Sequence, residues 1–274
     1  MELLVGQNAT LPMNLRVAAI QETVTVTGES PLINTQSVEV GSNIDRLQME
    51  QLPIQGRNWM ELSMLVKGVT ANDISSRPGA ARDELFQLNL DGQQITQQVA
   101  PSGFGQPGLS REAIAEYQVL TNQYDITMGR SAGMQVQAIS RAGTNQTTGS
   151  VYGYFRDDSW NAKDFIADRV LPYANQQTGF SLGGPITRDR VHYFGTYEYE
   201  REPQTIFSSP QLSGGQTFSL PVTVAKHNVL GRTDFQFGSR DHVVARVNFS
   251  TFKNPFAEVG GGTHPSGGSD QYRR

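Results

Sequence analysis

Apolar and polar residues alternate along most of the second half of the chain. In RVHYFGTYEYER (residues 190–201), one set of alternate positions carries valine, glycine and tyrosine, and the other carries histidine, phenylalanine, threonine and glutamate. The same alternation runs through SVYGYFRDD, GFSLGGP, NVLGRTDFQFG and DHVVARVNFSTF. A period of two residues predicts strands with two unlike faces. Turn signals predict where these strands end: Gly183–Gly184–Pro185, Arg188–Asp189–Arg190 and Gly238–Ser239–Arg240–Asp241.

Two architectures fit this alternation. Segments of roughly ten residues, tyrosine-rich on one face and charged on the other, are what an outer-membrane β-barrel requires. A soluble β-sandwich with one solvated face gives a similar pattern. The tyrosines favour the barrel, since their rings suit membrane interfaces. The alternation by itself leaves both architectures open for the second half of the chain, and the tyrosines lean toward the barrel.

The first half of the chain divides into three zones. Residues 1–27 hold short strand-like runs, which end in ETVTVT, and residues 28–37 form a polar linker. Residues 38–145 are mixed. There, VEVGSNI and FQLNLDG predict strands, the second ending in an Asp-Gly turn. EYQVLTN (116–122) and GMQVQAIS alternate apolar and polar residues, so each predicts a strand.

Two helix starts are predicted within residues 38–145. In DRLQMEQL, Asp45 is the N-cap, Gln48 completes a capping box, and Pro53 ends the helix. In SREAIAEY, Ser110 is the expected N-cap, and Glu112 lies in the first turn, where a negative charge favours the helix dipole. RNWMELSML is partly helical in pattern.

Composition agrees with an all-β protein or a wet barrel rather than one large dry core. Hydrophobic residues make up 37% of the 274 residues, and there are 28 glycines. The net charge of −4 argues against nucleic acid as a partner. Cysteine is absent, and no run of about 18 apolar residues predicts a transmembrane helix. The chain opens in mid-pattern and ends on the loop GGGTHPSGGSDQYRR, so we expect a fragment.

The sequence gives almost no support for a catalytic, cofactor or metal site. GFGQPG (103–108) matches G-x-G-x-x-G, but the strand-to-helix context of a dinucleotide site is missing, so we expect a glycine-rich loop. The four histidines fall in different strands and loops, without metal-ligand spacing on one helix. Asp157 and Asp158 are adjacent, which suits a loop or capping role better than paired acid–base work. We therefore expect no enzyme.

Several motifs, in order, resemble TonB-dependent outer-membrane receptors, particularly the Oar-like group with an N-terminal carboxypeptidase-regulatory-like sandwich. LPIQGRNWMELSMLVKGVT (52–70) is similar to the start of their plug, and FQLNLDGQQ is similar to a plug strand. Residues 110–165 resemble the passage from the last plug strands to the first barrel strand. QTGFSLGGPITRDRVHYFGTYEYER (177–201) resembles the next two barrel strands and their periplasmic turn. The resemblance covers roughly residues 22–250.

This resemblance implies an α+β plug domain at residues 38–145, followed at residues 146–274 by the N-terminal, truncated part of an outer-membrane barrel of antiparallel transmembrane β-strands, in a protein that is mostly β overall. A plug must be polar where it meets a wet lumen, and GMQVQAIS fits this by presenting Gln135 and Gln137 opposite its apolar side chains. The family's barrels have about 22 strands, so the strands predicted here make an incomplete barrel. It also implies a bacterial outer-membrane location, with the plug facing the periplasm and the barrel lumen. The implied partners are outer-membrane lipid, the inner-membrane TonB complex, and an unknown small or oligomeric substrate that the plug gates.

Two sets of residues are candidates for binding. Residues 22–27 resemble a TonB box; the alternative is the last strand of the regulatory-like sandwich. Two loops, at 71–84 and 97–109, are either substrate-facing or plain connectors. The TonB-box candidates are Glu22, Thr23, Val24, Thr25, Val26 and Thr27; the substrate-loop candidates are Arg77, Arg82, Gln97, Gln98, Phe104 and Gln106. A soluble or secreted β-rich binding or adhesion module remains the alternative function.

Overall fold

The structure is a computed structural model that divides into two compact units. It describes residues 40–52, 59–69, 87–95, 108–122, 134–163, 168–170, 173–208, 218–238, 240–255 and 271–273. The first unit takes its described residues from Met1–Leu52, Met60–Gly103 and Glu116–Ile139. The second takes them from Pro53–Trp59, Phe104–Ala115 and Ser140–Arg274. The predicted domain limits at 27, 37 and 145 stay predictions.

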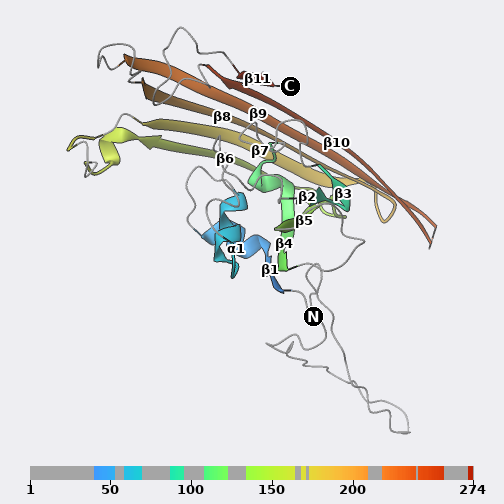
Figure 1. Ribbon diagram of the computed structural model, residues 1–274. Coiled ribbons are helices and arrows are strands. Elements are labelled where there is room, and N and C mark those ends of the chain that lie inside the picture. Colours follow the sequence, from blue (N-terminus) through green and yellow to red (C-terminus); the bar gives the residue numbers. More distant parts are fainter. Residues whose placement is uncertain are drawn as a thin grey trace. The chain divides into compact units, whose positions relative to one another are not determined.

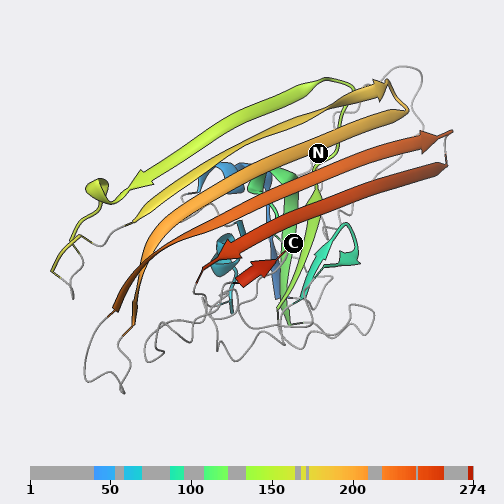
Figure 2. The ribbon, with the colours of Figure 1, turned by 90° about the horizontal axis from the view of Figure 1, so that it is seen from above.

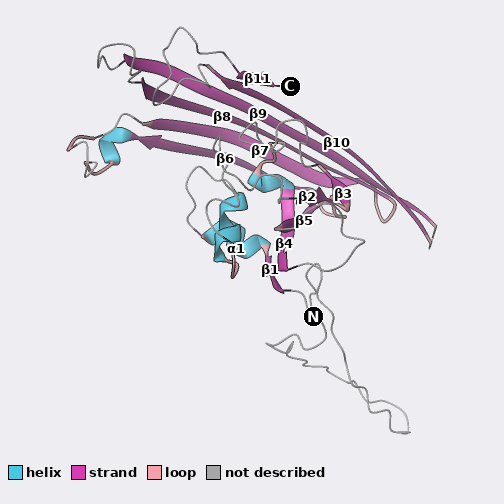
Figure 3. Ribbon diagram, in the orientation of Figure 1, coloured by secondary structure: helices cyan, strands magenta, loops and turns pink. Residues whose placement is uncertain are grey.

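A five-stranded sheet organises the first half of the chain, in the order β1-β4-β5-β2-β3 (Figure 3). Its strands are β1 (Val40–Ile44), β2 (Gln87–Leu90), β3 (Gln93–Gln94), β4 (Ile114–Asn122) and β5 (Gln135–Ser140). β1 pairs with β4 and β3 with β2 in antiparallel fashion, whereas β2 and β5 are parallel. The strands expected from VEVGSNI, FQLNLDG and GMQVQAIS are therefore present in the described residues.

The first predicted helix is confirmed, including its cap. α1 (Arg46–Gln51) starts after Asp45, whose Oδ1 accepts from the backbone N–H of Gln48 at 2.8 Å. The Gln48 Oε1 accepts in return from the backbone N–H of Asp45 at 3.0 Å. The RNWMELSML segment forms a 3₁₀ helix, η2 (Trp59–Leu65). The Asp-Gly turn is also present, with φ of 51° at Asp91 and 78° at Gly92, as a tight hairpin between β2 and β3 requires.

The second predicted helix is wrong beyond a single turn. Only the 3₁₀ helix η4 (Arg111–Ala113) forms, and the chain then enters β4 at Ile114. Ser110 makes no capping hydrogen bond with its side chain. The physical reason lies in Ile114 and Tyr117, which are both buried in the sheet, so their packing overrides the local helix signal. The strand predicted from EYQVLTN (116–122) is present as the larger part of β4.

The prediction of a wet glutamine face on β5 is also wrong for Gln135. This side chain is as buried as Val136 beside it, with 1% of its surface exposed. Gln135 is the register partner of Gln87 on β2, and its Nε2 donates to the Gln87 Oε1 at 3.5 Å. Gln87 in turn donates to the Asn89 Oδ1 at 3.0 Å. Amides that satisfy one another along a parallel pair can be buried without solvent.

The second unit contains a six-stranded antiparallel sheet of long, curved strands, in the order β11-β10-β9-β8-β7-β6 (Figures 1 and 2). The strands are β6 (Thr148–Asp157), β7 (Ala174–Thr187), β8 (Val191–Ser208), β9 (Phe218–Phe237), β10 (Asp241–Asn254) and β11 (Gln271–Arg273). A 3₁₀ helix, η6 (Asp158–Trp160), follows β6. Its N-cap is Asp157, which accepts from the Ser159 N–H, as a capping role predicts. The second-half strands predicted from the alternation are all present.

One of the three predicted turn signals in this sheet is wrong. The turns at Arg188–Asp189–Arg190 and after Phe237 are present, the first with Asp189 at a φ of 61°. Gly183–Gly184–Pro185 instead lies inside β7, paired with β8. Glycine at position 184 is explained by a close neighbour rather than by a turn, because a Cβ at Gly184 would lie 2.8 Å from the Thr147 Oγ1. Among the helices that the structure describes, none is both apolar and long enough to cross a membrane.

Candidate functional site: the polar face of strands β6 to β10

The two faces of the second sheet differ as the alternation predicted. On β8, the side chains of Phe194, Thr196, Glu198 and Glu200 are buried. The intervening Tyr193, Gly195, Tyr197 and Tyr199 are half-buried. Other strands of the sheet expose large apolar side chains on that second face, among them Val151 of β6, Phe180 of β7 and Val247 of β10. The sheet is therefore inverted relative to a soluble protein, with polar groups enclosed and apolar groups outside.

The enclosed carboxylates of β8 are hydrogen-bonded. Tyr152 donates its hydroxyl to the Glu198 Oε2 at 3.0 Å. Asn175 donates to the Glu200 Oε1 at 2.9 Å, and the Lys226 Nζ donates to the Glu200 Oε2 at 2.9 Å. Enclosing a charge is costly unless it is paired, so these contacts are what permit glutamates at this position. They join four neighbouring strands, from β6 to β9, through their side chains.

A second cluster on the same face is centred on Arg232 of β9. Its Nε and Nη2 donate to the carboxylate of Asp234 at 2.7–3.2 Å, in a bidentate ion pair. Its Nη1 donates to the carbonyl oxygen of Ser140 at 2.8 Å and contacts the Ser140 hydroxyl at 2.9 Å. The Nε2 of His242 lies 3.4 Å from the Asp234 Oδ1. Arg232 thus uses both edges of its guanidinium to hold Ser140 against the sheet.

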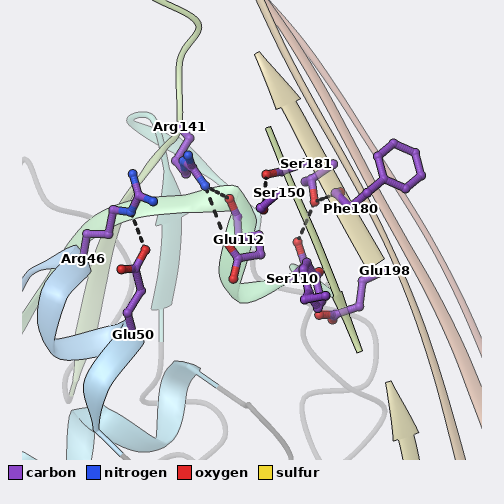
Figure 4. A network of polar contacts seen from close by, with 11 residues as sticks. Arg46, Glu50, Ser110, Glu112, Arg141, Ser150, Phe180, Ser181 and Glu198 are labelled. Carbon is purple, nitrogen blue, oxygen red and sulfur yellow. Dashed lines mark hydrogen bonds and ion pairs between the residues drawn. The ribbon is translucent and has the colours of Figure 1, made fainter. Parts of the chain in front are cut away.

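Two short segments of the second unit, 108–115 and 140–146, lie on this polar face. Arg141 forms an ion pair with Glu112 at 3.4 Å, as Figure 4 shows, and its guanidinium carbon lies 5.0 Å from the ring centroid of Phe194. The Ser110 hydroxyl is 3.4 Å from that of Thr196. Gly108 lies close to the side-chain amide of Asn228, which would have to shift to admit a Cβ at position 108. Both segments are held mainly by polar contacts.

The turn between β7 and β8 is held by Asn145. Its Nδ2 donates to the Asp189 Oδ1 at 2.6 Å, and its Oδ1 accepts from the Asp189 N–H at 2.9 Å. The Nε2 of His192 is also 2.8 Å from that oxygen. These bonds fix where the chain enters β6, three residues later.

The residues predicted from the sequence to bind TonB or substrate all lie outside the described residues. This applies to Glu22, Thr23, Val24, Thr25, Val26 and Thr27, and to Arg77, Arg82, Gln97, Gln98, Phe104 and Gln106. The structure instead brings together Ser140, Arg232 and Asp234, which the sequence analysis did not single out. The available signal was the i, i+2 spacing of opposite charges in RTD, which places Arg232 and Asp234 on one face of a strand.

The chemistry of this face is that of a hydrogen-bonded polar wall. Across the ranges that the structure covers, no group of three or more histidine, aspartate or glutamate side chains has the geometry to hold a metal ion. Carboxylates on this face are engaged by Tyr152, Asn175, Lys226 and Arg232.

Known proteins match both the sequence and this architecture. The family described as "Outer membrane beta barrel domain" matches residues 139–214. The TonB-dependent transporter Oar of Myxococcus xanthus is 23% identical over 213 residues, which are 69% of this chain and 19% of that protein. The chain is therefore similar in sequence to a TonB-dependent transporter of the Oar type. The resemblance inferred from the sequence motifs is thereby confirmed.

Solved receptor structures share the fold. The siderophore receptor PirA of Acinetobacter baumannii aligns with a TM-score of 0.54 and 18% identity, covering 80% of this chain and 32% of that one. PirA of Pseudomonas aeruginosa aligns with a TM-score of 0.55 and 19% identity, covering 78% of this chain and 34% of that one. The chain therefore spans about a fifth of the length of Oar and about a third of each solved receptor.

These relatives confirm three of the sequence predictions. The fold is a mostly β chain with barrel strands that do not close a barrel. The location is the bacterial outer membrane, which argues against the soluble or secreted alternative. The relatives are a transporter and receptors, so the expectation that the protein is not an enzyme holds as well.

Proposed function

We propose that this chain is the plug and first barrel strands of a substrate-gated transporter that takes its energy from the inner-membrane TonB complex. The observation that carries the proposal is the match to the Oar transporter along 69% of the chain. Support comes from the inverted sheet, with enclosed glutamates such as Glu198 on one face and exposed Val247 on the other. Residues 38–145 act as the plug and residues after 145 as the barrel wall.

The polar wall suits a segment that must be released and re-bound. A hydrogen bond that exchanges with water contributes only about 1 kcal/mol net, so Ser110 can leave Thr196 at small cost. The Arg232 contacts to Ser140 are stronger because the donor is charged. This mixture gives a closed state that is ordered and still reversible under a mechanical pull.

Residues 22–27 are proposed as the segment that TonB grips. Thr and Val alternate in ETVTVT, so the backbone is readily extended and can add as a strand to the edge of a partner's sheet. Gly28 and Pro31 in the linker then separate this strand from the plug.

The loops at 71–84 and 97–109 are proposed to contact the substrate. Arg77 and Arg82 suit an anionic group, whereas Gln97, Gln98 and Gln106 supply neutral hydrogen bonds and Phe104 an apolar contact. Two of the matched receptors are siderophore receptors, so an anionic metal chelate is one substrate class to assay.

The test is proline substitution in the protein expressed from its complete reading frame. Val24→Pro and Val26→Pro each remove a backbone donor from the proposed strand, so we expect cross-linking to TonB and energised uptake to be lost. Ser30→Pro, in the linker, is the matched control and is expected to leave both intact. If uptake and cross-linking survive both valine substitutions, residues 22–27 are not the TonB box.

A second measurement separates transport from a soluble binding role. Cell fractionation is expected to recover the protein in the outer membrane, and uptake of the substrate is expected to stop when the proton-motive force is dissipated. Recovery in the periplasm would contradict the transporter. Uptake that is independent of the proton-motive force would contradict TonB energisation while leaving the outer-membrane location intact.

A further inference from the structure

The apolar face of strands β6 to β10 is organised in rows that cross the strands. One row consists of five successive register partners, all apolar or aromatic: Val151, Phe180, Tyr197, Val229 and Phe249. Four of the five are exposed, and Tyr197 is half-buried. In the outer membrane, this row faces hydrocarbon.

The next row, two residues away on each strand, is more polar than the first. Its members are Gly153, Thr178, Tyr199, His227 and Thr251. The rings of Tyr199 and His227 lie 4.8 Å apart between centroids, and the Tyr197 hydroxyl is 2.9 Å from the His227 Nδ1. Amphipathic rings and hydroxyls of this kind mark the boundary between hydrocarbon and headgroups.

The third row carries two cations. It runs Phe155, Gln176, Arg201, Ala225 and Lys253. Arg201 and Lys253 both pair with Ala225 in register, from opposite sides, so their Cα atoms are about 10 Å apart, which is twice the strand spacing. Lys253 is exposed and Arg201 half-buried. Within the described ranges, no carboxylate forms an ion pair with either, and the residue between them, Ala225, has a small side chain.

The connections between strands place this row in one leaflet. The longer connections lie on its side of the sheet: residues 158–173 and 255–270 follow closely, and 209–217 lies seven residues further along β8 and β9. The opposite end carries the short turns at 188–190 and 238–240. Outer-membrane barrels have short periplasmic turns and longer extracellular loops. Arg201 and Lys253 therefore lie at the headgroup level of the outer leaflet.

We propose that Arg201 and Lys253 bind the phosphate of a phosphorylated lipid headgroup of the outer leaflet, held over Ala225. Arg supplies a planar fork that matches phosphate oxygens, and Lys supplies a compact point charge from the other side. The long stems of both residues lie along apolar surface while their heads reach the headgroups. Tyr199 and His227 border the site on its hydrocarbon side. The proposal rests on the outer-membrane location and is independent of whether the protein transports anything.

The experiment uses the protein expressed from its complete reading frame and purified from outer membranes in mild detergent. Native mass spectrometry counts the lipids retained, and a titration measures the affinity for bisphosphorylated lipid A and for its dephosphorylated form. The test variant is Arg201→Gln with Lys253→Gln. The matched control, Arg188→Gln with Arg240→Gln, removes the same charge from exposed positions in the short turns. Arg201→Lys with Lys253→Arg keeps both charges.

The wild-type protein is expected to retain the phosphorylated lipid and to bind it at least about tenfold more tightly than the dephosphorylated form. The glutamine pair should lose this preference, whereas the control and the charge-keeping variant should retain it. Electrophoretic heat modifiability checks that each barrel has folded. If the glutamine pair does not fold, the proposal is tested by the preference of the wild type between the two lipids and by the preference of the charge-keeping variant. Equal binding of both lipids by the wild type, or unchanged preference in a folded glutamine pair, would overturn the proposal.

Discussion

At the scale of single residues, the structure gives Arg232 a role that its charge alone did not suggest. The side chain is 11% exposed and makes charge-assisted bonds to Asp234 and to Ser140. An enclosed ion pair of this kind is weak evidence for stability in itself, but removing one partner leaves the other charge without compensation. Arg232 is therefore best tested against a variant that removes both charges.

We expect Arg232→Met to lower the free energy of unfolding by about 3 kcal/mol, because Asp234 stays enclosed without its main partner. The double variant Arg232→Met with Asp234→Leu should recover much of this loss. Urea denaturation in detergent, followed by intrinsic fluorescence, measures both. A single variant as stable as the wild type would show that the pair is solvated.

Tyr117 gives a pH-dependent prediction. Burial raises the pKa of Tyr117 above its ordinary value. Because the folded state resists ionisation of this phenol, its contribution to stability is fully present below about pH 10 and is lost as the pH rises beyond the pKa of the unfolded chain. We expect the wild-type free energy of unfolding to fall more steeply above pH 10 than that of Tyr117→Phe. Parallel curves for the two proteins would contradict this.

At the scale of elements, the two faces of each long strand tolerate opposite kinds of substitution: one face accepts apolar side chains and the other accepts polar ones. Val247 on β10 is 70% exposed and lies in the apolar outer rows, whereas Asn248 beside it points to the polar side. A one-residue step along the strand therefore moves a side chain from lipid to the wet interior.

We expect Val247→Arg to destabilise the folded barrel by about 2–4 kcal/mol and to reduce its amount in the outer membrane, because an arginine would face hydrocarbon. Asn248→Arg, the same substitution one residue later, is expected to have little effect. Heat modifiability and immunoblotting of membrane fractions compare the two variants. Equal tolerance at both positions would mean that β10 does not face lipid.

At the scale of the whole molecule, the sheet has two edges. β6 pairs only with β7, and β11 only with β10, among the strands that the structure describes. Backbone groups at such an edge have no partner in hydrocarbon, which is why membrane-spanning β structure closes on itself. The long edge strand β6 would also be a template for aggregation in water.

We therefore expect the 274-residue chain, expressed alone, to accumulate as aggregate and to show no heat-modifiable band in electrophoresis. The matched comparison is a chain extended with further barrel strands of the same protein, which should show the band. A monodisperse, heat-modifiable 274-residue protein would contradict the expectation and would require closure by self-association.

The sequence by itself determined the elements whose cause is local: the capping box at Asp45, the Asp91–Gly92 hairpin, and the two-residue period that gives β8 one face of glutamates and one of tyrosines. The order of the motifs along the sequence was also sufficient to indicate the receptor family. Tertiary structure decided the rest, because the deciding partners are distant in the chain. Burial of Ile114 and Tyr117 ended a predicted helix after one turn and started β4 earlier than the sequence indicated, and pairing with β8 kept Gly183–Gly184–Pro185 extended. Only register across three strands brings Arg201 and Lys253 to either side of Ala225.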